Sequence, residues 1–362
     1  MRLDRLWVTD FRNYESVDLS LAPGLTVVLG DNGQGKTSLL EAVGYVATLS
    51  SFRGVPNEAL VRHGCDRAVV RAEGTRDGRV LLLEAEIPTS GRGRVAVNRQ
   101  PLRRARDLLG AVRVTVFSPD DLSLVKDGPA ERRHYLDDVL TALHPRHDAL
   151  RSDLDRILRQ RNTLLRQATG HRADAELLAT LDVWDAKLAK AGEAMGVARQ
   201  ELIDRLQPEL TKAYAQVSGD RAGSAGDVAA VYDAPWRAEG LLAALSHARS
   251  DELRRGLSLV GPHRDEIVLT IGELPARTHG SQGEQRSLAL ALRLASHAVV
   301  AATVGEAPVL LLDDVFSELD EARAGALVAH LPANQAVLTS AGILPPGAQP
   351  DLVVRVAGGR IT

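Results

Sequence analysis

The sequence predicts an α/β fold that surrounds a phosphate-binding loop and is interrupted by a mostly helical insertion. Residues 30–37, Gly-Asp-Asn-Gly-Gln-Gly-Lys-Thr, fit the phosphate-binding pattern of Gly, four residues and Gly-Lys-Thr. Apolar runs typical of strands precede this loop and recur after residue 300, whereas residues 130–202 show the spacing of amphipathic helices. This order indicates one phosphate-binding fold whose two parts flank the helical insertion.

The individual elements follow from apolar periodicity and from turn signals such as Asp77-Gly78. Alternating or continuous apolar runs predict strands at residues 3–11, 17–21, 25–29, 67–73, 80–87, 94–97, 113–117, 257–260, 267–271, 308–312, 336–339 and 352–357. Apolar residues three and four positions apart predict helices at residues 130–143, 148–169, 177–202, 284–304 and 321–330.

The longest predicted helix carries a coiled-coil pattern. Apolar residues recur at alternating spacings of four and three, at Leu177, Leu181, Trp184, Leu188, Ala191, Met195, Ala198 and Leu202. Residues 151–166 are the expected antiparallel partner across a turn at Gly170. An amphipathic helix packed on a globular core shows a similar pattern over one heptad, but here the period persists over several. We therefore expect a short antiparallel coiled-coil hairpin, followed by a flexible linker at residues 218–227.

The composition is that of a globular protein without a global basic field. The chain has 362 residues, 44% of them hydrophobic, and a formal net charge of −3, so any contact with nucleic acid depends on local patches. Cys65, the single cysteine, excludes an intrachain disulfide and a cysteine metal cluster. The N-terminal residues lack the apolar core of a signal peptide, and no run reaches the ~18 apolar residues of a membrane span. We therefore expect a cytoplasmic protein without a membrane partner.

The phosphate-binding loop lies where its chemistry requires, between a predicted strand at residues 25–29 and a helix that starts near Ser38. Glycines allow several backbone N–H groups to point at one phosphate, and the helix N-terminus favours negative charge. Lys36 is placed to bind the β- and γ-phosphates of a nucleotide and Thr37 to ligate Mg²⁺. An ordinary glycine turn is the alternative, which the strand–loop–helix context disfavours. The predicted nucleotide-contacting residues here are Gly30, Asp31, Asn32, Gly33, Gln34, Gly35, Lys36, Thr37 and Ser38.

Two carboxylates follow the apolar run at residues 309–312. Because the carboxyl ends of parallel strands face the ligand crevice, Asp313 is placed to bind Mg²⁺ and Asp314 to polarise the attacking water. A solvent-exposed carboxylate pair is the alternative, and the phosphate-binding loop makes it the weaker one. The predicted catalytic residues are Lys36, Asp313 and Asp314, and the predicted metal ligands are Thr37 and Asp313.

A second anion site is predicted where Ser281-Gln282-Gly283-Glu284 precedes a long helix. The hydroxyl of Ser281 and the free N–H groups of the helix N-terminus suit a phosphate. One chain with one phosphate-binding loop has little use for a second such site, whereas two chains arranged head to tail would use it. A plain helix cap at Ser281 is the alternative.

These motifs together resemble an ABC-type ATPase head, and more closely the RecF family of DNA gap-repair proteins, which is related to structural-maintenance-of-chromosomes heads. Further segments that resemble the family are residues 11–14, 117–122, 132–133, 136–137, 261–265 and 310–320. The resemblance covers nearly the whole chain. It implies a first ATPase lobe formed by residues 1–118 and 300–362, and a helical second lobe with the signature motif at residues 119–299.

The resemblance also implies roles for individual residues. Arg12 and Asn13 are similar to residues that line the nucleotide beside the phosphate-binding loop. Ser281, Gln282, Gly283 and Glu284 are similar to the signature that reaches the ATP of a partner subunit. Residues 317–320 resemble the loop that joins the two sites, and residues 51–53 resemble an arginine-bearing loop near DNA and nucleotide, although an exposed arginine without such a role fits as well.

The sequence departs from the ABC pattern at three places. Asp314 stands where glutamate is usual, so water positioning and hydrolysis are expected to be poorer. Thr339-Ser340 occupies the strand where a histidine is common, and Asp120 and Asp121 occupy the place of the glutamine loop.

The resemblance implies an ATP-dependent DNA-binding protein of recombinational repair with weak, DNA-stimulated ATPase activity. ATP and Mg²⁺ are the implied cofactors. The implied partners are a second copy of the chain, double-stranded and gapped DNA, RecR, RecO and the RecA recombinase that it helps to load. A transporter ATPase subunit and a nucleotide-binding scaffold that does not hydrolyse ATP are the alternatives. Candidate DNA contacts, which are equally explained as a solvated face, are Arg92, Arg94, Arg99, Arg103, Arg104 and Arg106.

Overall fold

The computed structural model describes residues 2–76, 78–168, 175–218, 228–331, 334–342, 344–345 and 347–361. The chain forms two compact units. Unit 1 takes its described residues from the ranges 1–122, 209–225 and 282–362, and unit 2 from the ranges 123–208 and 226–281. By packing, residues 282–299 therefore group with unit 1, whereas the sequence-based division places them in the second lobe. The lobe boundaries at 118 and 299 stay a prediction.

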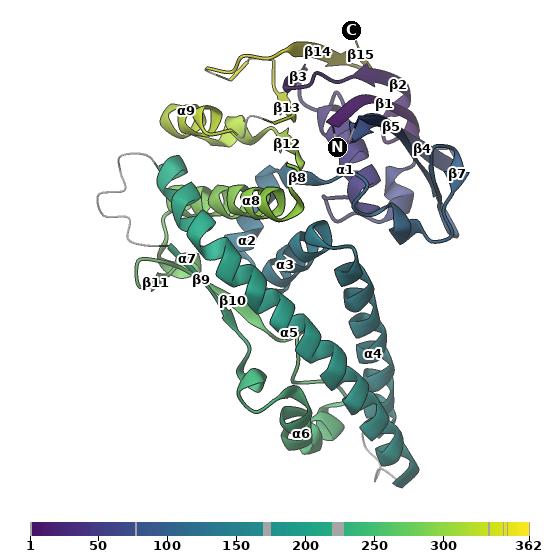
Figure 1. Ribbon diagram of the computed structural model, residues 1–362, viewed down its shortest axis with the longest axis vertical. Coiled ribbons are helices and arrows are strands. Elements are labelled where there is room, and N and C mark those ends of the chain that lie inside the picture. The colour runs from purple at the N-terminus through teal and green to yellow at the C-terminus, as the bar shows by residue number, and fades with distance from the viewer. Residues whose placement is uncertain are drawn as a thin grey trace. The chain divides into compact units, whose positions relative to one another are not determined.

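The first sheet of unit 1 has the strand order β15-β14-β3-β13-β12-β8 (Figure 1). Neighbouring strands run in parallel, except β14 and β15. The central strands β12 and β13 are buried over nearly their whole length, which explains their continuous apolar sequences. The C-terminal ends of β3 and β12 meet at one edge with β13 between them. The strands are β3 (Leu25–Leu29), β8 (Val114–Phe117), β12 (Val309–Asp313), β13 (Ala336–Ser340), β14 (Leu352–Ala357) and β15 (Arg360–Ile361).

The second sheet of unit 1 is antiparallel, with the order β2-β1-β4-β5-β6-β7. Strand β4 shows the alternation that such a sheet needs: Ala68, Val70 and Ala72 are buried, whereas Arg67 and Arg71 at alternate positions are exposed. One face of this sheet therefore contributes to the core. The strands are β1 (Arg2–Phe11), β2 (Tyr14–Ser20), β4 (Arg67–Arg76), β5 (Arg79–Pro88), β6 (Arg94–Val97) and β7 (Gln100–Pro101).

Helix α1 (Lys36–Thr48) packs against strands of both sheets and joins them into one core. That core contains Leu6 and Val70 from the antiparallel sheet, Leu40 from α1, and Val28 and Leu311 from the parallel sheet. Unit 1 also contains α8 (Gln282–Val304) and α9 (Glu321–Ala329). Among the described residues, α8 is the one helix long and apolar enough to cross a membrane, but 67% of its most apolar window is buried, as in a core helix.

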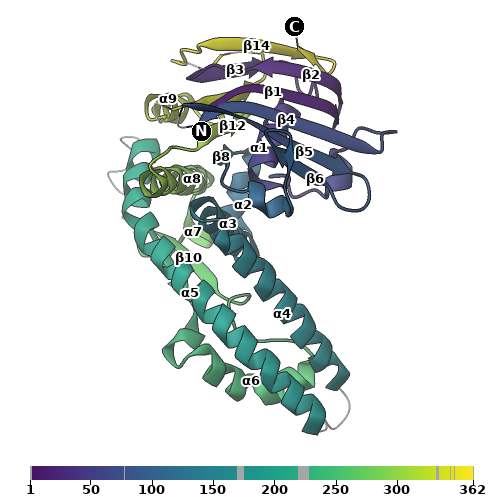
Figure 2. The same cartoon turned by 45° about the vertical axis from the view of Figure 1, so that its right-hand side comes forward.

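Unit 2 is mostly helical, with a small sheet of order β11-β10-β9. Helices α4 and α5 run side by side in opposite directions, as the hairpin prediction requires (Figures 1 and 2). Gly170 and residues 219–227 of the predicted linker lie outside the described residues. The elements are α2 (Ser123–Lys126), α3 (Pro129–Leu143), α4 (Arg146–Ala168), α5 (Ala175–Ser218, in unit 2 up to Pro208), α6 (Leu241–Arg255), α7 (Ala276–His279), β9 (Val228–Asp233), β10 (Glu266–Ile271) and β11 (Leu274–Pro275).

Helix α5 buries a wider face than a two-stranded coiled-coil seam needs. The predicted seam residues Leu181, Leu188 and Met195 are fully buried, seven positions apart. A second face is also closed, because a Cβ at Gly192 would lie 2.3 Å from Leu241 of α6. The antiparallel hairpin is thus combined with the packing of an amphipathic helix on a globular core.

The predicted strand at residues 257–260 is wrong, because this segment is an irregular loop. Its backbone donors bind side chains instead of a neighbouring strand. The N–H of Ser258 donates to Asn162 Oδ1 at 2.8 Å, and the N–H of Leu259 donates to Glu252 Oε1 at 2.7 Å. Strand β9 and helix α6 are elements for which the sequence analysis made no prediction.

Candidate nucleotide-binding site

The glycine loop connects β3 to α1, as the motif predicts. Gly35, the residue before α1, has a φ of 112°, a backbone conformation that side chains other than glycine rarely adopt. A Cβ at Gly35 would lie 2.5 Å from Asn13 Nδ2 and 2.7 Å from Tyr14 Oη. The Asn13 amide donates to Gln34 O at 3.1 Å, and the Tyr14 hydroxyl donates to Gly35 O at 3.0 Å. Residues at the turn between β1 and β2 therefore fix the backbone of the glycine loop through these two hydrogen bonds.

Lys36 is buried, with 6% of its surface exposed, and its ammonium lies inside the loop. Its Nζ donates to Gly30 O at 2.7 Å and to Asp31 O at 2.9 Å. An ammonium has three donors, and within the described residues these two bonds use two of them. The third is available to an oxygen of a bound phosphate.

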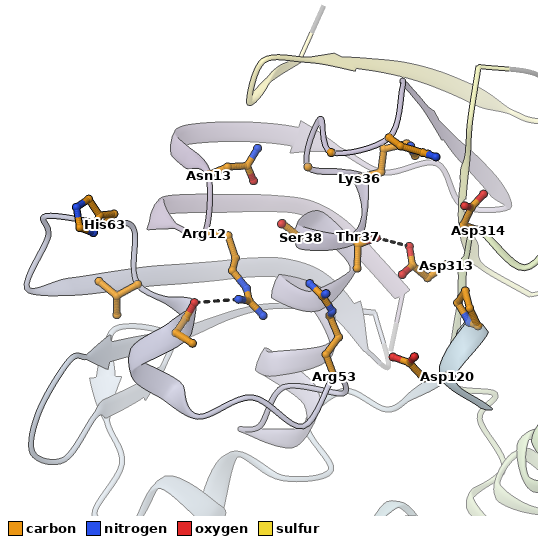
Figure 3. Close-up of a pocket in the computed structure, with 16 residues that line it drawn as sticks. Arg12, Asn13, Lys36, Thr37, Ser38, Arg53, His63, Asp120, Asp313 and Asp314 are labelled. Atoms are coloured by element: carbon orange, nitrogen blue, oxygen red, sulfur yellow. Dashed lines mark hydrogen bonds between the residues drawn. The ribbon is translucent and has the colours of Figure 1, made fainter. Parts of the chain in front are cut away.

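Asp313 is buried at the C-terminal end of β12, and its Oδ1 accepts hydrogen bonds from two hydroxyl groups, of which Figure 3 shows that of Thr37. Thr37 Oγ1 donates at 2.9 Å and Thr339 Oγ1 at 2.8 Å. Burial raises the pKa of Asp313, and the adjacent charge of Asp314 acts in the same direction, whereas the two hydroxyl donors oppose it. Thr339 Oγ1 also accepts from the N–H of Asp314 at 2.9 Å, so it positions both carboxylate residues.

One cavity of about 760 Å³ collects most of the predicted site (Figure 3). Gly30, Asp31 and Gln34 belong to the loop but do not line this cavity. Gln282, Gly283 and Glu284 do not line it either, and Ser281 belongs to unit 2. The predicted residues that do line it are Arg12, Asn13, Asn32, Gly33, Gly35, Lys36, Thr37, Ser38, Asp313 and Asp314.

The cavity is also lined by residues to which the sequence analysis gave no firm role, namely Arg53, Ala59, Val61, His63, Pro119 and Asp120. Asp120 lines the cavity, whereas its neighbour Asp121 does not. Asp121 is buried, and its Oδ1 accepts from Arg293 Nη2 at 2.7 Å and from Arg293 Nε at 3.0 Å. Only Asp120 of the pair therefore faces the cavity.

Arg12 lines the cavity, but its charge is already paired. Its Nε and Nη2 each donate at 2.7 Å to the carboxylate of Glu41, which is fully buried on α1. Its Nη1 donates to Ala59 O at 3.0 Å. Sequence reasoning missed Glu41. The signal that points to it is a carboxylate four residues after Thr37, one helical turn on, among apolar neighbours.

The predicted signature begins helix α8 with its first residues at the surface. Ser281 and Gln282 are exposed. The guanidinium of Arg323 lies against Gly283, where an added Cβ would be 2.7 Å from Arg323 Nη2. Arg323 Nη1 also donates to Asp320 Oδ2 at 2.7 Å. Arg323 thus ties the start of α8 to Asp320, the last residue of the predicted connecting loop.

Comparison with known proteins identifies the family. Residues 2–339 match the family model described as RecF/RecN/SMC N terminal domain. The DNA replication and repair protein RecF of Arthrobacter sp. (strain FB24) is 43% identical over 397 residues, which cover 100% of this chain and 97% of the relative.

Solved structures share the fold. A structure of the recombination mediator protein RecF-ATP in the RecFOR pathway has a TM-score of 0.89 at 26% identity, covering 100% of this chain and 97% of that chain. A Pyrococcus furiosus Smc head domain has a TM-score of 0.57 at 15% identity, covering 100% and 95%, and supports the fold alone. These likenesses confirm the predicted α/β fold of an ABC-type ATPase head with an inserted helical region. By family model and by full-length identity, the chain belongs to the RecF family of DNA replication and repair proteins.

Proposed function

We propose that this chain is an ATP-dependent DNA-binding protein of recombinational repair, whose ATP-bound dimer holds duplex DNA near single-strand gaps and helps to load RecA. The observation that carries this proposal is the convergence of Lys36, Thr37 and Asp313 at one cavity. A solved relative of the same family is a complex with ATP. RecR and RecO are the proposed protein partners and the cytoplasm the proposed location.

The residues of the cavity fit ATP with Mg²⁺. The hydroxyl of Thr37 and the carboxylate of Asp313, 2.9 Å apart, are oxygen ligands of the kind that Mg²⁺ prefers. Bound Mg²⁺ neutralises charge on the phosphates. Lys36 binds phosphate oxygens, and Asp314 orients the attacking water as a general base. Its side chain is one methylene shorter than that of the glutamate common in ABC heads, so hydrolysis is slow and serves to reset the dimer.

A second chain would complete each nucleotide site. Ser281 and Gln282 are exposed, so the start of α8 is accessible to a neighbour. In the proposed dimer, ATP on the loop of one chain meets Ser281 of the other, together with the N-terminus of that helix, whose dipole favours negative charge. ATP therefore joins two chains, and hydrolysis releases them.

The DNA contact is proposed at the β6–β7 hairpin and the segment after it. The six candidate arginines are exposed, and no described residue forms an ion pair with them. Arginines on the outer face of the same sheet are paired instead, for example Arg5 with Asp18 and Arg71 with Glu84. Unpaired guanidinium groups are free to neutralise phosphates without reading bases.

The proposal is tested by DNA binding to gapped, duplex and single-stranded substrates at stated salt, with and without ATP. We expect ATP to strengthen binding to gapped and duplex DNA and Lys36→Ala to abolish that gain. Lys126→Ala, the same substitution in unit 2, serves as the control. DNA binding that is indifferent to ATP in the wild type would reject the proposal.

A scaffold that binds ATP without hydrolysing it is the second candidate. Asp314 replaces glutamate, and the Thr339 hydroxyl is already engaged with Asp313 and Asp314. Phosphate release in the presence of DNA distinguishes the two functions: release that Asp314→Asn abolishes supports the ATPase, and no release above a protein-free control supports the scaffold. Membership of the RecF family disfavours the transporter alternative.

A further inference from the structure

The β14–β15 hairpin packs against the glycine loop. Its turn consists of Gly358 and Gly359, whose φ values are 56° and 70°. Two consecutive residues with positive φ form the tight turn that best fits the twist of an antiparallel hairpin, and glycine adopts this conformation without strain. The N–H of Gly358 donates to Gln34 Oε1 at 2.6 Å. The turn is therefore bonded directly to the side chain of a loop residue.

The backbones of the hairpin and the site also approach closely at two further points. A Cβ at Gly359 would lie 2.8 Å from Asn13 O, and a Cβ at Gly30 would lie 2.4 Å from Val356 O on β14. Neither position has room for a side chain, because the obstructing atoms are backbone oxygens that cannot rotate away. The hairpin thus contacts the first residue of the glycine loop and the turn that contains Asn13.

The two residues that the turn contacts, Asn13 and Gln34, meet at one peptide group of the glycine loop. Asn13 Nδ2 donates to Gln34 O at 3.1 Å. In a trans peptide the C=O of Gln34 and the N–H of Gly35 point in opposite directions, so a hydrogen bond that holds the first also fixes the second. The Gly35 N–H is one of the loop donors from which a bound phosphate accepts. The direction of this donor therefore depends on Asn13 and on Gln34.

We propose that the Gly358-Gly359 turn is a positioning element for phosphate binding, which holds Asn13 and Gln34 and through them the N–H of Gly35. This inference rests on the proposed nucleotide site and adds a support that lies 324 residues from Gln34 in the sequence. The N–H groups of such a loop hold the α- and β-phosphates, which ATP and ADP share. The turn therefore acts on the binding of both nucleotides alike.

The test measures the affinity of the full chain for ATP and for ADP with Mg²⁺ by titration calorimetry. Gly359→Ala is expected to weaken the binding of each nucleotide about tenfold, because the new Cβ displaces the backbone of Asn13. Gly358→Ala is the matched control: it lies in the same turn with a positive φ, but its Cβ would have no atom within 4 Å, so the affinity should change less than about threefold. Gln34→Met keeps the length of the side chain without its acceptor and should weaken both nucleotides about fivefold.

A double variant separates positioning from general damage. Because both changes act on the same peptide group, Gly359→Ala combined with Gln34→Met should weaken binding by less than the product of the two single factors. Factors that multiply, a loss confined to ATP, or equal affinities of Gly358→Ala and Gly359→Ala would overturn the inference. If Gly359→Ala fails to fold, Gln34→Met decides alone, and a wild-type affinity of that variant is the contrary result.

Lys36→Ala distinguishes a failure of this inference from a failure of the nucleotide site. ATP binding retained by Lys36→Ala refutes the site itself and the inference with it. Loss of ATP binding in Lys36→Ala, together with wild-type affinity in Gly359→Ala and Gln34→Met, refutes only the role of the turn.

Discussion

At the scale of single residues, the protonation of Asp313 links the site to pH. Burial raises its pKa, so this carboxyl takes up a proton at a higher pH than an exposed aspartate does. The proposed Mg²⁺ site requires the ionised form of this carboxyl, so a proton would compete with the metal. Hydrogen bonds from Thr37 and Thr339 favour the ionised form and limit the rise of the pKa.

We predict that Mg²⁺-dependent ATP binding weakens as the pH falls, and that Thr339→Val moves this loss to higher pH. The substitution removes a donor that lowers the pKa of Asp313, so the carboxyl is protonated earlier. Calorimetric titration of ATP at several pH values, with and without Mg²⁺, measures the shift. Thr339→Ser keeps the hydroxyl and should follow the wild type. A midpoint that stays in place or moves to lower pH in Thr339→Val contradicts this account.

Glu41 leads to a prediction about stability. Its carboxylate is fully buried and bound to Arg12, so Glu41→Gln leaves the guanidinium without its counter-charge. Breaking a buried pair in this way is expected to lower the free energy of unfolding by about 3 kcal/mol. Urea unfolding measures the loss, with Glu58→Gln, an exposed glutamate, as the control that should stay within about 0.5 kcal/mol. Equal stability of the two variants would show that the pair does not hold this part of unit 1 together.

At the scale of elements, a buried ion-pair cluster joins three segments of unit 2. Arg161 on α4 is fully buried, and its Nε donates to Asp185 on α5 at 2.6 Å. Its Nη2 donates to Glu252 on α6 at 2.6 Å, and its Nη1 to Ser258 at 2.8 Å. Where α4 and α5 meet at Arg161 and Asp185, one guanidinium thus takes the place of the apolar contact that a coiled-coil seam would have.

Arg161→Met is predicted to lower the free energy of unfolding by about 3–5 kcal/mol, because Asp185 and Glu252 lose their shared counter-charge in a buried place. Arg159→Met, two residues earlier on the exposed side of the same helix, should be close to the wild type. Denaturant unfolding followed by circular dichroism compares them. A loss of similar size in both variants would assign the effect to helix propensity and not to the cluster.

The arginine hairpin supplies a prediction about salt. The N–H of Leu102 donates to Val95 O at 2.9 Å, which brings Arg103 close to Arg94. If both bind phosphates, the double change to glutamine reduces the slope of log affinity against log salt by about 2. Arg5 and Arg71, which are paired on the same sheet, are changed together as the matched control and should leave the slope as it is. Equal slopes in all three proteins would remove the hairpin from the DNA-binding surface.

Local sequence patterns predict an element correctly where the interactions that form it lie within the segment, and fail where they come from distant residues. The strand–loop–helix at residues 25–48 was predictable because its turn chemistry lies within the segment itself. Residues 257–260 have the local pattern of a strand, but Glu252 and Asn162 bind their backbone N–H groups. The hydrogen bond from Ser258 to Asn162 joins residues that are 96 positions apart in the sequence. No local pattern reports partners at that separation, and the burial of Arg161 escaped prediction for the same reason.

At the scale of the whole molecule, some residues of the candidate nucleotide site could be predicted from the sequence and others could not. That Lys36, Thr37 and Asp313 lie together at one cavity could be predicted, because parallel strands bring their C-terminal ends to one edge. The role of Glu41 could not be predicted, because its carboxylate binds Arg12, 29 residues away, and the hydroxyl of Ser51 in a separate turn. The exposed start of α8 agrees with a site that a second chain completes.

The most direct test of this central claim is the mass of the particle in solution, measured by light scattering with ATP and Mg²⁺. One chain has a mass of 38.8 kDa. We predict that the Asp314→Asn variant, in which hydrolysis is blocked, doubles this mass when ATP is added. Adding Ser281→Arg to that variant should leave the single-chain mass while ATP still binds. A single-chain mass for Asp314→Asn saturated with ATP, or a doubled mass that persists with Ser281→Arg, would contradict the account.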